Sequence, residues 1–446
     1  SVSCRATEAQ PWQGWQSDPP DGWLAAPPDS VVAGPLEPLT GYLRAKGTVW
    51  YDDAGPCAPR ICSLFPAIRQ YRDNPTLFAR NLDAMMGYWH GARIFWCLRG
   101  APWDQYQLEV DVTWPNYDAL FVAVLREFKA RNLRVALTSG TLHDHQLPNM
   151  EANFERVGRL AASVDQTTVI THAVINEPGM CSPYGDGYGG ATDTCSEEPW
   201  KYYRVLLDGF RSQYPWGHHG TGCQGGDPEA TENSGSPSGV IYGSRPPATH
   251  ACVQGTRYPW QNALERAFDM GYNVRRAVGV PVWEEEPAGN DGGLPAVFQP
   301  MNDHDTLLAY YAIKLFTGQA LTSLNSCGLW EQNPLDSVWG FKEIPQLLAD
   351  IGLPDDIGTY QVGNLHKAPI TASGVYRCDG AWHDGQGRAF QIVHGGTDWQ
   401  LTSRWAGHVT LWRASGQVWE GPVSPGAVFY QAHGSPKPAV LVLEQV

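Results

Sequence analysis

Two glutamate-bearing segments follow apolar runs of the kind that form buried strands. In the first, VITHAVINEPG, the residues Asn176, Glu177 and Pro178 end an apolar run at 168–175. A carboxyl group held against the walls of a sheet is poorly solvated, so its pKa rises and it can carry a proton near neutral pH. We therefore predict Glu177 as a general acid and base and Asn176 as a hydrogen-bonding partner for a substrate hydroxyl. The alternative is an ordinary turn at a strand end.

The second segment, VGVPVWEEEPAGND, places three consecutive glutamates after an apolar run at 278–284. Strand alternation predicts Glu284 and Glu286 on one face and Glu285 on the other. A charge run is most often a solvated loop. Here an apolar strand leads directly into the cluster, and buried carboxylates are costly unless they serve a site. We therefore interpret this cluster as a source of a nucleophile.

The elements around these segments alternate between strand-like and helix-like runs. Strands are predicted at 46–51, 92–98, 133–138, 168–175, 216–221, 248–254, 278–284 and 319–324. Helices are predicted at 75–89, 117–131, 150–162, 199–213, 259–274, 304–317 and 340–351, with a Gly/Ser-rich loop in place of a helix over 216–247. This alternation indicates parallel βαβ units. Eight units favour a closed (β/α)8 TIM barrel over an open doubly wound sheet.

Three parts are predicted along the chain. Residues 1–40, rich in Pro, Gly and Trp, form an arm packed on the barrel at 41–357, and residues 358–446 form a small all-β sandwich. Short alternating runs such as RAFQIVHGG support the sandwich. Its tryptophans are predicted to pack in its core rather than to form a sugar platform: Trp382, Trp399, Trp405, Trp412 and Trp419.

The two segments together predict an active site more specifically than either one alone, because strands four and seven face each other across an eight-stranded barrel. Two glutamates at their carboxyl ends would then lie about 5–5.5 Å apart, the separation of a double-displacement glycosidase. We predict that Glu286 attacks the anomeric carbon. Glu177 would protonate the leaving oxygen and then activate the water that hydrolyses the covalent intermediate.

With these motifs, residues of about 40–351 resemble glycoside hydrolase clan A, the retaining (β/α)8 group. That clan carries its acid/base in an N-E-P-type motif on strand four and its nucleophile on strand seven. In many members the nucleophile stands five positions after a Pro, which points from Pro281 to Glu286. The E-E-E run departs from the usual single Glu, so Glu284 stays a rival nucleophile. The resemblance implies β-specificity.

The resemblance also implies substrate-binding positions. Arg93 in GARIF corresponds to the strand-two arginine that orients the nucleophile, with Arg99 as a second choice, and Trp330 corresponds to the tryptophan after strand eight that floors a sugar subsite. Strand six usually brings a His or Tyr to the nucleophile. The candidates near that strand are Tyr258, His250 and Gln254, and His143, beside His145, is predicted to line the sugar site after strand three.

Composition narrows the cellular setting and the partners. The net charge of −15 repels nucleic acid and anionic membranes, and no run of about 18 apolar residues exists. The 10 cysteines favour a secreted or periplasmic protein with disulfides. Connectivity stays open, and the plausible close pairs are Cys57 with Cys62, Cys181 with Cys195, and Cys223 with Cys252.

No cofactor or metal is expected. The G-x-G-x-x-G match at 185–190 does not lead from a strand into a helix, and His218 and His219 lack a third ligand at zinc spacing. Asp186 and Asp193 fit a solvated loop better than a calcium site. The expected partner is a poly- or oligosaccharide, and the sequence does not indicate an oligomeric state. The alternative function is a catalytically silent carbohydrate-binding barrel.

Overall fold

The computed structural model describes most of the chain in separate stretches. These are residues 34–99, 108–139, 149–174, 198–215, 218–220, 248–253, 263–269, 271–272, 275, 279–284, 303–323, 334–364, 368–374, 377–395, 398–432 and 437–446. The predicted arm at 1–40 falls largely outside them, because the description begins at Gly34.

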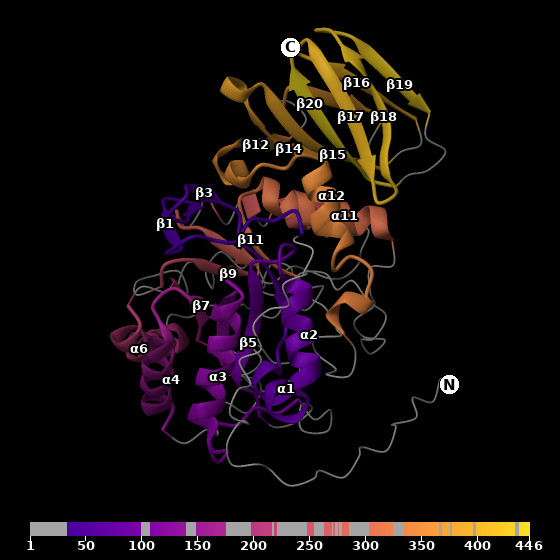
Figure 1. Ribbon diagram of the computed structural model, residues 1–446. Helices are drawn as coiled ribbons and strands as arrows, with labels where there is room; N and C mark the ends of the chain where they lie inside the picture. The colour runs from indigo at the N-terminus through magenta and orange to yellow at the C-terminus, as the bar shows by residue number, and fades with distance from the viewer. Residues whose placement is uncertain are drawn as a thin grey trace, which may run out of the picture.

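Parallel strands form the central sheet of the larger domain (Figure 1). In chain order these are β4 (Arg60–Ser63), β5 (Gly91–Cys97), β6 (Arg134–Ser139), β7 (Val169–Ala173), β8 (His218–Gly220), β9 (Ala251–Val253), β10 (Val282–Glu284) and β11 (Ala320–Ser323). The strand order is β8-β7-β6-β5-β4-β11-β10-β9, so the last strand pairs with the first and the chain neighbours β8 and β9 stand at the two ends. Ala173 of β7 and Cys252 of β9 share a buried cluster across the β8 position. The sheet is therefore a (β/α)8 barrel.

Helices surround the barrel. They are α1 (Ala67–Asp73), α2 (Pro75–Met85), α3 (Tyr117–Ala130), α4 (Met150–Val164), α6 (Glu198–Gln213), α9 (Ala263–Asp269), α11 (His304–Phe316) and α12 (Glu343–Asp350). In α3, for example, Leu120, Val124 and Phe128 recur at helical spacing and are buried. The start of α2 shows how local sequence sets a boundary. Asn74 accepts a hydrogen bond from the backbone amide of Leu77 (3.2 Å), and Pro75 occupies the first turn.

The predicted first barrel strand at 46–51 is wrong. Those residues belong to a small antiparallel sheet of β1 (Arg44–Lys46), β2 (Val49–Tyr51) and β3 (Pro56–Cys57). Gly47 makes the turn between β1 and β2 with a φ of 59°, a conformation that glycine adopts without strain. The first barrel strand is β4, whose short RICS sequence lies close to two prolines and shows little periodicity. The other seven predicted strands overlap the barrel strands β5 to β11.

The small sheet closes the amino-terminal end of the barrel. Trp50 of β2 is 1% exposed, its ring packs edge-on against Trp283 of β10 at 5.4 Å, and its indole nitrogen donates to the carbonyl of Val282 (3.3 Å). The same interior cluster includes Ile61 of β4 and Ala136 of β6. Buried apolar side chains therefore fill the barrel interior at this end.

The carboxyl-terminal domain is a β-sandwich, as predicted. Its six-stranded sheet, in spatial order, consists of β12 (Gln361–Asn364), β14 (Arg377–His383), β15 (Arg388–His394), β20 (Ala439–Gln445), β17 (Gly407–Arg413) and β18 (Gly416–Val423). The second sheet consists of β13 (Ile370–Ser373), β16 (Asp398–Ser403) and β19 (Val428–Ala432). Trp382 and Trp399 lie in the core between the sheets, and Trp405 and Trp419 pack against it. These tryptophans therefore have a packing role, as predicted.

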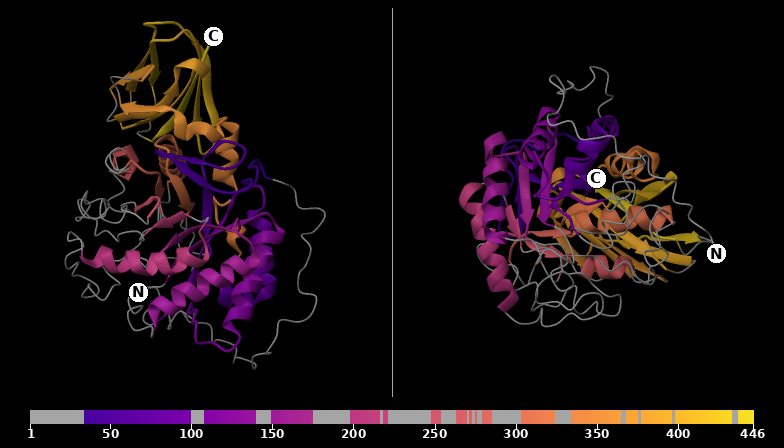
Figure 2. Two further views of the ribbon diagram at one scale, coloured as in Figure 1. Left: turned by 90° about the vertical axis from the view of Figure 1, so that its left-hand side faces the viewer. Right: turned by 90° about the horizontal axis from the view of Figure 1, so that it is seen from below.

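The sandwich sits at one end of the molecule and packs along α11 of the barrel (Figures 1 and 2). Short 3-10 helices complete the described structure: η5 (Leu335–Ser337), η6 (Asp355–Thr359) and η7 (Asp384–Gln386). Phe316 at the end of α11 contacts Phe390 of β15, with ring centroids 5.7 Å apart. Among the described helices, none has the length and apolar character needed to cross a bilayer.

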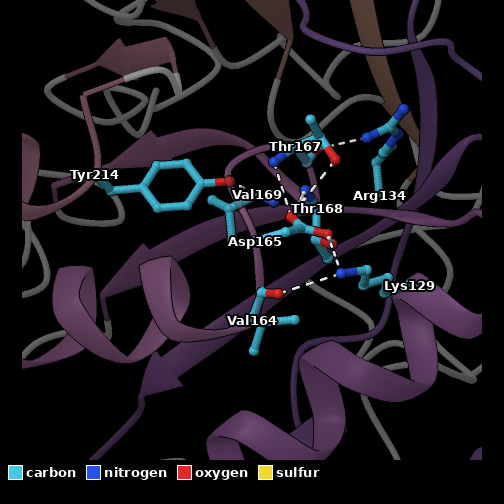
Figure 3. A network of polar contacts seen from close by, with 8 residues as sticks. All are labelled: Lys129, Arg134, Val164, Asp165, Thr167, Thr168, Val169 and Tyr214. Atoms are coloured by element: carbon cyan, nitrogen blue, oxygen red, sulfur yellow. Dashed lines mark hydrogen bonds and ion pairs between the residues drawn. The ribbon is translucent and has the colours of Figure 1, made fainter.

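A polar network fixes the turn that leads into β7 (Figure 3). The carboxylate of Asp165 accepts hydrogen bonds from the backbone amides of Thr167 (2.8 Å) and Thr168 (2.7 Å), and Lys129 of α3 lies 3.1 Å from it. Partial burial opposes ionisation, but the two amides and Lys129 outweigh it and lower the pKa of Asp165. Arg134 at the start of β6 donates to the carbonyl of Thr167 (2.7 Å). These contacts set where the fourth barrel strand enters the sheet.

We expect Asp165→Ala to lower the free energy of unfolding by about 2 kcal/mol, because two backbone amides lose a charged acceptor. Urea unfolding followed by circular dichroism measures this change. The matched control is Asp118→Ala, which removes a half-exposed carboxylate paired with Arg156 and should cost less than about 1 kcal/mol. Equal decreases in the free energy of unfolding of both variants would show that the hydrogen bonds of Asp165 stabilise the fold no more than an exposed ion pair does.

Candidate functional site

The carboxyl ends of the barrel strands form the candidate site, because the amino-terminal end is closed and the connections after the strands lie at the open end. Counting from β4, β7 is the fourth strand and β10 is the seventh. In the sequence, the NEP motif begins two residues after the last residue of β7, and the glutamate cluster begins with Glu284, the last residue of β10. The strands that precede the two motifs are therefore the fourth and the seventh, as predicted, whereas the positions of Glu177 and Glu286 stay predictions.

Arg93 is the predicted site residue that the structure describes most fully. It lies in β5, the second barrel strand, and its side chain is wholly buried. Its register partner in β6 is Ala136, a member of the interior cluster, so Arg93 faces the barrel interior. The guanidinium Nε donates to Thr138 Oγ1 (3.1 Å). A buried cation is stable only where polar or anionic groups compensate it, so its presence here indicates a polar centre.

Two aromatic rings hold the Arg93 guanidinium in place. Its central carbon lies 5.2 Å from the ring centroid of Phe65 and 5.2 Å from that of Phe95, and the two rings pack edge-to-face at 4.8 Å. Cation–π contacts in a desolvated site are stronger than exposed ones. The chain after β4 therefore supplies part of the wall around this arginine, since Phe65 follows that strand directly.

The end of the fourth strand is fixed to the end of the third. Ser139 Oγ, in the last residue of β6, donates to the carbonyl of Val174, the residue after β7. Both residues are almost completely buried. This bond therefore fixes the chain at Val174, two positions before Asn176 in the sequence.

The seventh strand is held between its two neighbours. Glu284 pairs through its backbone with Val253 of β9 and Leu321 of β11, and Trp283 pairs with Cys252 and Ala320. The Trp283 ring is 1% exposed and packs in the barrel interior. The strand that leads into the glutamate cluster is thus anchored on both sides, although the side chain of the rival nucleophile Glu284 lies outside the description.

Several predicted site residues lie outside the described residues and stay predictions. They are His143, His145, Asn176, Glu177, Gln254, Tyr258, Glu286 and Trp330. The second-choice arginine, Arg99, is described, and its Nε lies 2.9 Å from a carboxylate oxygen of Asp111 in an ion pair. Arg99 follows the end of β5, whereas Arg93 is inside the barrel, so the structure favours Arg93 for the predicted orienting role.

His250 does not fit the strand-six role at the site. It precedes β9, at the amino-terminal end of that strand. Its ring lies 5.6 Å from that of Trp50, and its Nε2 lies 3.2 Å from the Cys252 sulfur. His250 therefore belongs to the closed end of the barrel.

His172 in β7 is a buried histidine that is not among the predicted site residues. It accepts a hydrogen bond from the Trp96 indole (3.2 Å), and its ring stacks on Phe210 of α6 at 4.0 Å. Burial lowers its pKa to about 3, so the ring is neutral at physiological pH. It lies next to Thr171 and Ala173, and its contacts with Phe154 and Phe210 place it between the sheet and the helices α4 and α6. Its role is packing behind the site.

A polar pocket of about 780 Å³ lies at the opposite end of the barrel. Its lining includes His90, Asn132 and Arg134, which stand before β5 and at the start of β6, together with Asp52 and Asp355. Burial, and the charge of Arg60, lower the pKa of His90 to about 3. This pocket faces away from the carboxyl ends of the strands and is not the candidate active site. Within the described ranges, no three His, Cys, Asp or Glu side chains gather to hold a metal ion.

The predicted disulfide between Cys57 and Cys62 is wrong, because both are free thiols in the structure. Cys57 faces the barrel interior with Trp50 and Ile61, whereas Cys62, the neighbour of Ile61 in β4, faces the layer between sheet and helices. The two side chains therefore pack in different layers. The predicted pair of Cys223 with Cys252 is also wrong, because Cys252 forms no disulfide in the structure. Cys181 and Cys195 lie outside the described residues, so their pairing stays a prediction.

Comparisons with known proteins give structural matches only. No protein-family model matches the chain, and no curated protein matches its sequence. A family 5 glycoside hydrolase from Bacteroides vulgatus has a TM-score of 0.57 at 12% identity, covering 91% of this chain and 94% of that one. A putative glycoside hydrolase from the same organism has a TM-score of 0.59 at 12% identity, covering 91% and 82%.

A further match is a GH27 β-L-arabinopyranosidase from Geobacillus stearothermophilus, with a TM-score of 0.50 at 10% identity, covering 87% of this chain and 97% of that one. At such identities these matches show a shared fold. They span the barrel and the C-terminal domain together, because the coverage exceeds the barrel alone. The predicted resemblance to the barrel glycoside hydrolases is therefore confirmed at the level of the fold.

We expect stability to fall as the pH drops below 6.5, since His172 binds a proton in the unfolded chain but not in the fold until about pH 3. This group alone should contribute about 1.4 kcal/mol per pH unit over that window. Urea unfolding at several pH values measures the slope. His172→Phe keeps a ring on Phe210 but cannot bind a proton. The dependence of its free energy of unfolding on pH should therefore be smaller by about 1.4 kcal/mol per pH unit. An unchanged dependence would contradict the lowered pKa of His172.

We expect Cys57 and Cys62 to resist Ellman's reagent in the native protein, because burial raises the pKa of both thiols and blocks access. Both should react at once in guanidinium chloride without any reductant. Mass spectrometry of alkylated peptides identifies the two residues. Recovery of a Cys57–Cys62 linked peptide would show that the pairing predicted from the sequence forms after all.

Proposed function

We propose that this protein is a retaining glycoside hydrolase that cleaves β-glycosidic bonds of a poly- or oligosaccharide. The observation that carries the proposal is the strand count of the barrel: the NEP motif follows the fourth strand, and the glutamate cluster ends the seventh. The fold shared with structures described as glycoside hydrolases supports it.

Barrel geometry explains why these two positions suit one sugar ring. The fourth and seventh strands are three positions apart in a barrel of eight, so they stand across the barrel mouth from each other rather than side by side. Carboxylates that project inward from them face each other. A separation of about 5–5.5 Å leaves room for a sugar carbon but not for an extra water, which is the arrangement of the retaining mechanism.

In the proposed reaction, the Glu286 carboxylate attacks the anomeric carbon while the glycosidic C–O bond breaks. The leaving oxygen takes the proton of Glu177, so a glycosyl ester and a free alcohol result. Glu177, now a carboxylate, takes a proton from water as the water oxygen attacks the same carbon. The ester bond breaks, Glu286 is restored as a carboxylate and Glu177 is again protonated.

The buried Arg93 supports this assignment by its charge. A guanidinium beside a carboxylate favours the ionised form and lowers its pKa. The nucleophile must be ionised, whereas the acid must hold its proton, so the two groups need different environments. We assign Arg93, fixed between Phe65 and Phe95, to keeping the nucleophile ionised.

The test uses three variants at the two strand ends, assayed on aryl β-glycosides and dyed polysaccharides. Glu286→Gln should abolish turnover because the nucleophile is gone. Glu177→Ala should slow substrates with poor leaving groups by about 10²–10⁴-fold but spare dinitrophenyl glycosides, which need little acid help. Azide should rescue this variant and yield a β-glycosyl azide.

Glu284→Gln is the matched control and should stay active. If it were the inactive variant while Glu286→Gln kept its activity, the nucleophile would be Glu284. Sugar binding without turnover by the wild-type protein across the panel would favour the catalytically silent binding barrel instead.

A further inference from the structure

The polar pocket at the amino-terminal end of the barrel lies where several distant parts of the chain meet. Its volume is about 780 Å³, and its lining comes from residues 37–41 before β1, the turn between β2 and β3, residues at or just before the starts of β5 and β6, and the start of η6. All of its lining residues are described. Small-molecule sites have volumes of about 300–1,000 Å³, so the pocket is large enough for a small organic ligand.

Arg60 places a buried cation beside this pocket. It is the first residue of β4, its side chain is 5% exposed, and its backbone amide donates to Nδ1 of the lining residue His90 (2.9 Å). The Nε of Arg60 has no hydrogen-bond partner, and its terminal nitrogens make no hydrogen bond to any described residue. A buried guanidinium without acceptors is costly, so a group that accepts hydrogen bonds would stabilise it.

A gap separates this guanidinium from the nearby carboxylate of Asp355. Asp355 Oδ1 lies 3.9 Å from a terminal nitrogen of Arg60, which is beyond the usual hydrogen-bond range of about 2.7–3.2 Å. The Asp355 side chain is 68% exposed and lines the pocket, so a group bound in the pocket can reach this gap. The bridging group must accept from Arg60 and donate to Asp355. A hydroxyl does both, whereas a carboxylate only accepts and an ammonium only donates.

The charges of the lining distinguish between classes of ligand. Arg134 is the cation of the lining, whereas its carboxylates come from Glu37, Asp52, Asp355 and Asp356. This excess of negative charge repels phosphate, sulfate and carboxylate ligands. An organic cation would suit the carboxylates but would leave the buried guanidinium without an acceptor. A neutral molecule with several hydroxyl groups satisfies both kinds of group.

Backbone groups hold two of the lining side chains in place. The Asp52 carboxylate accepts from the backbone amide of Thr40 (2.8 Å) and from two amides of the turn that follows it (2.8 and 3.1 Å). Arg134 donates to two backbone carbonyls (2.7 and 2.6 Å). The side chains of Glu37 and Asn132 make no hydrogen bond to another described residue, so they are available to further hydroxyl groups. Binding to a lining that is already ordered costs less conformational entropy.

We propose that this pocket is a second carbohydrate-binding site, in which a sugar hydroxyl bridges Arg60 and Asp355. The hydroxyl oxygen accepts a hydrogen bond from the guanidinium, and the hydroxyl proton is donated to the carboxylate. The pocket lies at the end of the barrel opposite to the carboxyl ends of the strands. The inference therefore goes beyond the proposed hydrolysis and adds a place where the protein holds carbohydrate without cleaving it.

Amide hydrogen exchange of the wild-type protein with neutral disaccharides tests the proposal at the pocket itself. The panel is cellobiose, mannobiose, xylobiose and lactose, with sodium phosphate and spermidine as charged comparisons. At least one disaccharide should slow exchange in the peptides that cover residues 52–60 and 353–360, and neither charged compound should do so. Titration of this protection gives the dissociation constant for the pocket.

Asp355→Ala tests the bridge. Because the side chain is exposed, its removal should leave the melting temperature nearly unchanged. Loss of a hydrogen bond to a charged group should raise the dissociation constant by about tenfold or more. Asp53→Ala is the matched control, because Asp53 pairs with Arg44 at the surface (2.6 Å) and does not line the pocket. Its dissociation constant should equal that of the wild-type protein.

Three results would overturn the inference. In the first, no disaccharide slows exchange in these peptides, which would mean that water alone fills the gap. In the second, Asp355→Ala binds the disaccharide as tightly as the wild-type protein does. In the third, phosphate or spermidine protects the peptides and no sugar does. Protection at this pocket is measured without turnover, so failure of this inference and failure of the proposed function are separate results.

Discussion

The backbone ladder of the parallel barrel is the constraint on which the rest of the structure depends. A one-residue slip in register would turn each interior side chain outward. The ladder pairs β4, β5, β6, β7, β10 and β11 on both sides, and the described residues of β8 and β9 stand at its two ends. It also decides which residues share the barrel interior, and so it determines which side chains can meet at one substrate.

The barrel interior changes character from one end to the other. At the closed end, Trp50, Ile61 and Trp283 form an apolar cluster. Farther along the strands, Arg93 and Thr138 are buried and joined by a hydrogen bond. Apolar burial stabilises the first region, whereas the second holds a charge at a desolvation cost that a packed core would not require. This gradient supports a site at the carboxyl ends of the strands.

The sequence predicted the regular parts of this fold well. Long apolar runs such as GARIFWC are buried on both faces, which is the pattern of parallel strands, and their positions were found. The first barrel strand was missed because RICS is four residues long and carries no period. KGTVWY was assigned in its place, since an antiparallel hairpin has the same local alternation as an edge strand.

Side-chain direction explains the other differences. Proximity in sequence suggests a disulfide between Cys57 and Cys62, but the two residues lie in strands of different sheets, and their side chains pack in different layers. Arg93 was identified through its place in a family pattern. The hydrogen bond from the backbone amide of Ala414 to the carboxylate of Asp305 could not be predicted, because it joins residues 109 positions apart in two domains.

The stereochemistry of the first product tests the central claim most directly. Proton NMR of the wild-type protein acting on a β-glycoside resolves the anomeric signal before the free sugar equilibrates. Two displacements at one carbon, by a carboxylate and then by water, predict that the β-anomer appears first. Initial release of the α-anomer would mean a single displacement by water and would contradict a nucleophilic carboxylate at the end of the seventh strand.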